Sequence, residues 1–278
     1  ADDITDGYAH TGTGSDGDVI DYQIISTLPT ITSNATALTT YTFADTLTKG
    51  IEYNRGDVKL EWFQDAACTE KITQWTENSG KFAVEYGTAI HDSTTMTISM
   101  TAAGLDEINN AASVYDASSL YRGYSGCTVR ITYACTVNSS ADVVYGDDGN
   151  PNTVTLTWKR TNTSYFDTLT DDCHLYVYAI DLTKKFSDEL GNFAKVQFAI
   201  HNDTDGYFVL AQWNEAESCY YVTGHAAEEA KATKFVPNQN GQIIVKGLED
   251  DSYTLTELQT DSGYTLLKDA IQIVITSQ

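Results

Sequence analysis

One glutamate near the end of the chain stands among apolar residues of a predicted strand. Residues 253–258 read Tyr-Thr-Leu-Thr-Glu-Leu. Because strand side chains alternate between two faces, Tyr253, Leu255 and Glu257 share a face. A carboxylate buried there is costly unless it is protonated or paired. Glu257 is therefore a candidate for proton-transfer chemistry, and the alternative interpretation is an exposed glutamate on an edge strand.

A lysine ends another alternating row. Tyr178, Ile180, Leu182 and Lys184 fall on one face by period-two counting, so Lys184 is predicted to point inward, whereas Lys185 points outward. Burial penalises an ammonium group, and the neutral amine that results is a nucleophile. Lys184 is therefore the lysine of this row that we expect to be buried.

The first part of the chain holds a second acid and two asparagines on or next to predicted strands. Asp45 follows Tyr41 and Phe43 on one predicted face. Asn152 begins an inward row that continues with an apolar residue at every second position to residue 158. Asn150 directly precedes a proline and is assigned to a turn, so Asn152 is preferred over Asn150 as the inward-pointing asparagine.

Composition excludes several classes of function. The 278 residues contain 16 basic and 39 acidic side chains, for a formal net charge of −23. Such a charge repels nucleic acids and anionic membranes, so neither is expected as a partner. No stretch is apolar enough for a membrane span, and the first residues lack the pattern of a signal peptide, so we expect a mature or trimmed product.

The spacing of short strand-like runs predicts an all-β fold of two tandem immunoglobulin-like sandwich domains. Runs at 19–27, 41–43, 58–63, 82–86, 95–100, 128–137 and 153–158 form the first domain, with a short helix near 104–112. The pattern breaks into Thr, Asn and Asp at 159–172. We therefore place domain one at 1–170 and domain two at 171–278. Domain two comprises seven further runs, the first at 175–182, and a polar segment at 226–234 that is a candidate helix.

Cysteines and histidines indicate neither a metal centre nor an enzyme. The five cysteines form no CxxC pair, and their disulfide pairing stays open. The five histidines are scattered, and no catalytic-triad pattern appears. We expect no metal and no cofactor, with a calcium site in the acidic loop 142–150 as an alternative. A glycan-active enzyme that uses paired carboxylates is a further alternative.

The second domain resembles a Cna B-type domain of Gram-positive surface proteins. The matching features are Asp-Leu-Thr-Lys at 181–184, the turn-strand-turn run at 241–253, and Tyr-Thr-Leu-Thr-Glu at 253–257 followed by Ser-Gly-Tyr at 262–264, which corresponds to the E-box of that family. The first domain resembles the preceding sandwich of sortase-assembled backbone pilins through residues 17–22, 43–50, 129–133 and 149–156. Both domains in this order resemble a backbone, or major, pilin.

The resemblance implies autocatalytic isopeptide bonds between lysine and asparagine side chains beside a buried acid. It assigns Lys184 as the lysine and Glu257 as the acid of the second domain, and Asn152 (then Asn150) as the asparagine and Asp45 as the acid of the first. Residues 1–18 contain no lysine and residues 241–278 no asparagine. We therefore expect the chain to be cut at both ends, and a pilin-motif lysine and a sorting signal are also absent from it.

The resemblance further implies a structural role with no enzymatic turnover beyond the single autocatalytic event. The chain would be a subunit of a pilus shaft, extracellular and anchored to the cell wall, with neighbouring pilin subunits and sortase as partners and adhesion to host or bacterial surface receptors as its outcome. The alternative is an adhesin or a minor, tip pilin that binds a host or glycan ligand, with residues 64–124 as a binding insertion.

Overall fold

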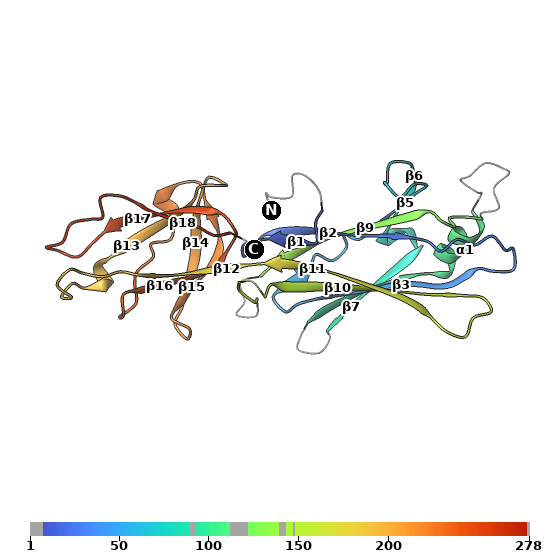
Figure 1. Cartoon of the computed structure of the whole chain (residues 1–278), viewed down its shortest axis with the longest axis horizontal. Helices are drawn as coiled ribbons and strands as arrows, with labels where there is room; N and C mark the ends of the chain where they lie inside the picture. Colours follow the sequence, from blue (N-terminus) through green and yellow to red (C-terminus); the bar gives the residue numbers. More distant parts are fainter. Residues whose placement is uncertain (1–7, 89–92, 112–121, 139–142, 147, 277–278) are drawn as a thin grey trace. The chain divides into compact units, whose positions relative to one another are not determined.

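The computed structural model describes residues 8–88, 93–111, 122–138, 143–146 and 148–276 (Figure 1). The chain forms two compact units. The middle unit comprises residues 19–136 and 151–173, and the terminal unit comprises residues 1–18, 137–150 and 174–278. Almost all regular structure is strand, so the predicted all-β fold of immunoglobulin-like sandwiches is confirmed.

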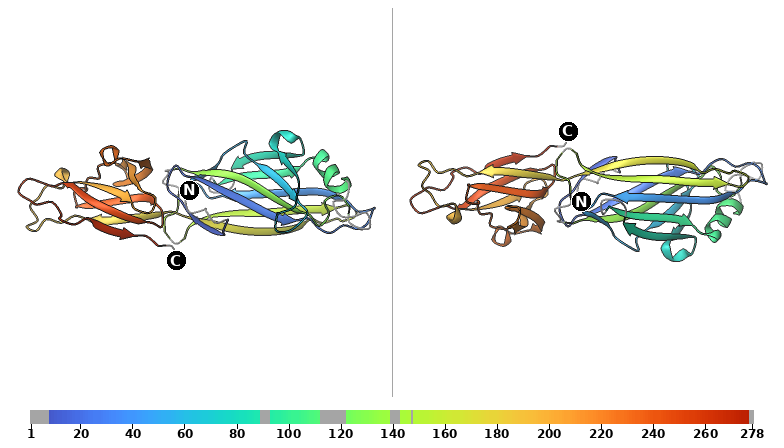
Figure 2. Two further views of the ribbon diagram at one scale, coloured as in Figure 1. Left: turned by 90° about the horizontal axis from the view of Figure 1, so that it is seen from above. Right: turned by 90° about the horizontal axis from the view of Figure 1, so that it is seen from below.

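The middle unit is a sandwich of two sheets (Figure 2). One sheet has the order β11-β10-β3-β8-β7, formed by Asp167–Tyr176, Asn150–Arg160, Leu38–Leu47, Thr94–Met100 and Phe82–Thr88. The other has the order β2-β9-β5-β6, formed by Val19–Thr27, Thr128–Val137, Lys59–Phe63 and Lys71–Thr76, and β4 (Ile51–Tyr53) pairs with β9. Both sheets turn alternate side chains inward, which is why their buried residues follow a period of two.

Strand β3 illustrates how this unit buries its core. Tyr41, Phe43, Asp45 and Leu47 are each at most 1% exposed, and the residues that alternate with them are more accessible. The neighbouring strands pair in register: Asp45 lies opposite Val154 of β10 and Met96 of β8. Asp45 is thus the one acid in an otherwise apolar or aromatic inward row of β3.

The described residues of this unit include one α-helix. Helix α1 (Ala102–Asn110) begins after Thr101, whose hydroxyl accepts a hydrogen bond from the backbone N–H of Gly104 at 3.2 Å. A Cβ on Gly104 would lie 1.9 Å from the carbonyl oxygen of Lys81. Only glycine allows this close approach of the helix.

The terminal unit contains a seven-stranded sheet of order β12-β16-β15-β14-β13-β17-β18. Its strands are Tyr178–Thr183, Gln242–Leu248, Cys219–Ala226, Tyr207–Asn214, Gln197–Asn202, Ser252–Gln259 and Ile271–Val274. All neighbours are antiparallel except β15 and β16, which are parallel. The core includes Val196, Ile200, Phe235, Val245 and Tyr253, all at most 1% exposed. In the same unit β1 (Thr11–Thr13) pairs in parallel with the last three residues of β11.

Several predicted elements differ from the observed ones. The segment 159–172, where the strand pattern of the sequence breaks, contains the end of β10 at Arg160 and the start of β11 at Asp167. The single run predicted from residue 175 is two strands, β11 and β12, separated at Val177. The polar segment predicted at 226–234 contains one short 3₁₀ turn, Glu229–Lys231. No helix in the described part of the chain is long and apolar enough to cross a membrane.

Candidate functional site

Lys184 and Glu257 meet in the terminal unit. Lys184 follows the last residue of β12, and Glu257 lies on the inward face of β17. The Lys184 Nζ donates a hydrogen bond to Glu257 Oε1 at 2.7 Å. Their side chains are 11% and 0% exposed. A buried pair of this kind can pass a proton from nitrogen to oxygen, which leaves an amine and a carboxylic acid in contact.

The second carboxylate oxygen of the pair is also occupied. The backbone N–H of Leu267 donates to Glu257 Oε2 at 2.7 Å. This bond comes from the segment that follows β17, so the residues after the strand fold back over the acid. Glu257 is therefore held at both oxygens, and its orientation toward Lys184 is fixed.

Aromatic rings cover the lysine. The centroid of the Phe186 ring is 5.3 Å from Lys184 Nζ, and Phe186 packs on Tyr264 at 4.5 Å and on Phe193 at 5.3 Å. Tyr264 in turn donates a hydrogen bond to Asp188 Oδ1 at 2.7 Å. These rings lower the local polarity around the amine and exclude water from it.

Asp45 is the centre of a buried network in the middle unit. The hydroxyl of Tyr53 donates to Asp45 Oδ1 at 2.6 Å, and that of Tyr133 donates to Asp45 Oδ2 at 2.9 Å. Burial raises the pKa of Asp45 to about 6, against the hydrogen bonds from Tyr53, Tyr133 and Asn152, which lower it. An acid with this pKa can both give and take a proton near neutral pH.

Asn152 adjoins this network. Its Nδ2 donates to the hydroxyl oxygen of Tyr133 at 2.9 Å. Its Oδ1 is buried and has no hydrogen-bond partner among the described residues. An unsatisfied buried acceptor is costly, and this oxygen can accept a further hydrogen bond.

Asn150 has a different environment. Its Oδ1 accepts from the backbone N–H of Val144 at 2.8 Å, and its Nδ2 donates to the carbonyl oxygens of Val144 and Leu175. All of these partners are main-chain groups, so Asn150 ties two backbone segments of the terminal unit together. Asn152 contacts the buried acid network, and Asn150 has the contacts of a structural residue.

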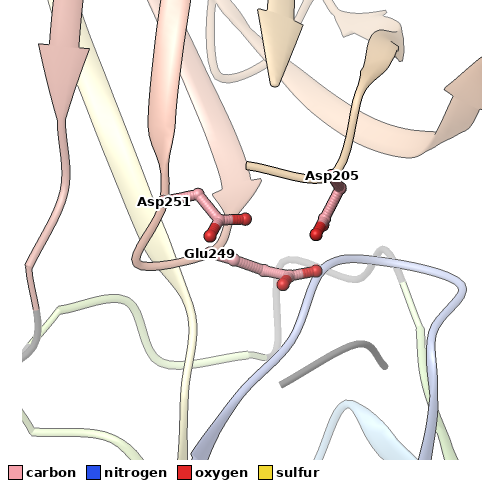
Figure 3. Close-up of side chains that lie close together, drawn as sticks. All are labelled: Asp205, Glu249 and Asp251. Carbon is pink, nitrogen blue, oxygen red and sulfur yellow. The ribbon is translucent and has the colours of Figure 1, made fainter. Parts of the chain in front are cut away.

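An acidic cluster was not predicted. Asp205, Glu249 and Asp251 place carboxylate oxygens within 4.8 Å of one another (Figure 3). Asn202 donates to Asp251 at 2.8 Å, and burial, with Asp18 second, raises the pKa of Glu249 to about 8. Glu249 is then mostly protonated at neutral pH, which reduces the repulsion in the cluster. The acidic residues at 249–251, directly before a strand, are the signal from which it could have been found.

Three other predictions concern the cysteines, the acidic loop at 142–150 and the segment 64–124. All five cysteines are free. The proposed calcium loop at 142–150 includes residues 142 and 147, which lie outside the described residues. Parts of the segment 64–124, namely 89–92 and 112–121, also lie outside them.

Together, the fold and the buried acids define a class of tandem β-sandwich proteins with a lysine–acid pair in one unit and an acid–amide pair in the other. Residues 179–278 match the model of the family described as SpaA, prealbumin-like fold domain. No curated protein matches the chain.

The chain resembles solved backbone pilins of Gram-positive bacteria in fold. The T6 backbone pilin of Streptococcus pyogenes is 16% identical with a TM-score of 0.60, over 95% of this chain and 48% of that one. The chain thus spans about half of that pilin. The C-terminal 35 kDa fragment of the major pilin GBS80 of Streptococcus agalactiae is 15% identical with a TM-score of 0.64, over 96% and 87%. The major pilin SpaA of Corynebacterium diphtheriae is 16% identical with a TM-score of 0.60, over 95% and 63%.

Proposed function

We propose that the chain is a structural subunit of a covalently assembled pilus shaft, and that each of its domains is closed by an isopeptide bond between a lysine and an asparagine. The observation that carries the proposal is the buried contact of 2.7 Å between Lys184 and Glu257, within the residues that match the SpaA family. The structure of the diphtheria pilin SpaA is described as pointing to a modular pilus assembly with stabilising isopeptide bonds.

In this proposal Glu257 accepts a proton from Lys184, and the resulting amine attacks the side-chain carbonyl of an asparagine. Residues 241–278 contain no asparagine, so the partner in this proposal is an asparagine that is not among them. In the middle unit the roles are reversed: Asp45 and Asn152 are present, and the lysine is not among residues 1–18. The unpartnered Oδ1 of Asn152 supports this arrangement, because an incoming amine would supply the missing donor.

We propose a domain boundary between residues 170 and 171. We further propose that the subunit is secreted, that sortase joins it to neighbouring subunits at the cell wall, and that the shaft supports adhesion to surface receptors. A bond between terminal strands would prevent extension beyond the crosslink and reduce the entropy of the unfolded chain, as a disulfide does.

Intact-mass measurement of the full-length protein tests the proposal. Each isopeptide bond releases one ammonia, and peptide mapping locates the crosslink. We expect Lys184→Arg and Glu257→Gln each to retain the ammonia of the bond at Lys184, whereas the matched control Lys185→Arg loses it as wild type does. A full-length wild-type protein with the unshifted mass would refute the crosslinking function.

A further inference from the structure

Tyr133 bridges the acid and the amide of the middle unit. Its hydroxyl oxygen is 2.9 Å from Asp45 Oδ2 and 2.9 Å from Asn152 Nδ2. The three residues are 4%, 1% and 5% exposed, so water does not compete for these contacts. A hydrogen-bonded link from the acid to the amide nitrogen therefore runs through this hydroxyl, beside the interaction of Asn152 with Asp45 that lowers the pKa of the acid.

Tyr53 provides the contrast. It binds the other carboxylate oxygen, Asp45 Oδ1, at 2.6 Å. Its ring packs against the ring of Tyr133 at 5.9 Å, whereas the Nδ2 of Asn152 donates to the hydroxyl of Tyr133. Two tyrosines thus hold the same acid, and Tyr133 also contacts the nitrogen that must leave.

We propose that Tyr133 is a catalytic residue of bond formation at Asn152 and relays a proton from Asp45 to the departing nitrogen. This inference rests on the proposed function, which supplies the reaction. The co-reactant is the primary amine of a lysine side chain.

The step balances in atoms and protons. The amine nitrogen bonds to Cγ of Asn152, and in the tetrahedral intermediate Nδ2 becomes basic. Protonated Asp45 gives its proton to the Tyr133 oxygen while the Tyr133 proton moves to Nδ2. The bond between Cγ and Nδ2 then breaks, ammonia leaves, and the attacking nitrogen returns one proton to Asp45. The Tyr133 oxygen lies 2.9 Å from both Asp45 Oδ2 and Asn152 Nδ2, so the proton can move from the acid toward the amide nitrogen once the Tyr133 hydroxyl has rotated.

A raised pKa and a ring held in place by stacking suit Tyr133 to the relay. Burial, followed by the charge of Asp45, raises the pKa of Tyr133 well above its usual value, so the hydroxyl keeps its proton between transfers. The ring is held by parallel stacking on Tyr22, with centroids 5.5 Å apart and planes 7° apart. Tyr133→Phe should keep this packing and remove the hydroxyl, with its hydrogen bonds to Asp45 and Asn152.

The test follows the full-length protein during cell-free synthesis, with intact mass and peptide mapping as functions of time. We expect wild type and the matched control Tyr41→Phe, whose hydroxyl bonds Ser26 and not Asp45, to lose ammonia at Asn152. Tyr133→Phe should do so at least about tenfold more slowly, given the usual range of acid–base catalysis. The melting temperature of each variant checks that it is folded. A second variant carries 4-aminophenylalanine at position 133, which retains a donor and a lone pair and should recover part of the rate.

The outcomes separate the two claims. A wild-type protein without the bond at Asn152 overturns the proposed function and the relay together. A wild-type protein with the bond, and a Tyr133→Phe variant as fast as Tyr41→Phe, overturns the relay alone. If Tyr133→Phe does not fold, a folded 4-aminophenylalanine variant that loses no ammonia also overturns the relay.

Discussion

Replacing Asp45 by asparagine should change how the stability of the middle unit depends on pH. The pKa of Asp45 is raised from 3.8 to about 6 because the carboxyl is buried. The folded state therefore holds this proton more tightly than the unfolded state does, so the contribution of Asp45 to stability is fully present below about pH 4 and is lost as pH rises to about 6.

The magnitude follows from the difference between the two pKa values. A shift of about two units corresponds to about 3 kcal/mol of unfolding free energy at pH 7.5. The amide introduced by Asp45→Asn does not titrate. Its oxygen can accept from one of the hydroxyls of Tyr53 and Tyr133, and its NH2 group can donate to the other after that hydroxyl rotates. Relative to Asp45→Asn, wild type should thus lose about 2 to 3 kcal/mol between pH 4 and pH 7.5.

Guanidinium unfolding of both proteins at several pH values, followed by tryptophan fluorescence, measures this difference. Asp21→Asn is the matched control, because Asp21 is exposed on β2. Its difference from wild type should stay within about 0.5 kcal/mol across the range. A flat difference for Asp45→Asn would show that the acid is not perturbed. A difference of opposite sign would show that the tyrosine hydrogen bonds outweigh burial.

Three further substitutions test other parts of the structure. Lys184→Met leaves a buried carboxylate without its partner and should cost about 3 to 5 kcal/mol in denaturant unfolding, whereas Lys185→Met should stay within about 0.5 kcal/mol; equal effects would contradict the buried pair. Gly104→Ala puts a Cβ 1.9 Å from the carbonyl oxygen of Lys81 and should lower stability by about 2 kcal/mol or more, and a neutral result in the same assay would contradict that contact. Glu249→Gln removes a group whose pKa is raised to about 8, so wild type should lose stability relative to it as pH rises from about 5 to 8; parallel thermal-melting profiles would refute this.

The sequence predicts the inward acids and the lysine because each ends or interrupts an alternating row. Asp45 continues the row of Tyr41 and Phe43, and Glu257 continues that of Tyr253 and Leu255. Both acids are buried in the structure. Period-two counting needs only neighbours along one strand, so it requires no knowledge of which strands meet.

The tyrosine partners of Asp45 could not be predicted in this way. Tyr133 lies on β9 of the opposite sheet, and Tyr53 lies on the short strand β4 that pairs with it. Which side chains meet across a sandwich depends on how the two sheets pack, which sequence periodicity does not encode. Strand β11 was missed because its residues 168–172 are exposed on both faces, so no alternation marks it.

The long sequence separations within the two sites have a consequence for folding. Lys184 and Glu257 are 73 positions apart, and Asp45 and Tyr133 are 88 apart. Contacts between such distant positions form only after large loops have closed, which is a late and slow event in folding. A chain that has not reached its native topology cannot bring these groups together. The proposed isopeptide bonds would therefore form only in correctly folded subunits, and misfolded subunits would remain without crosslinks and open to proteolysis.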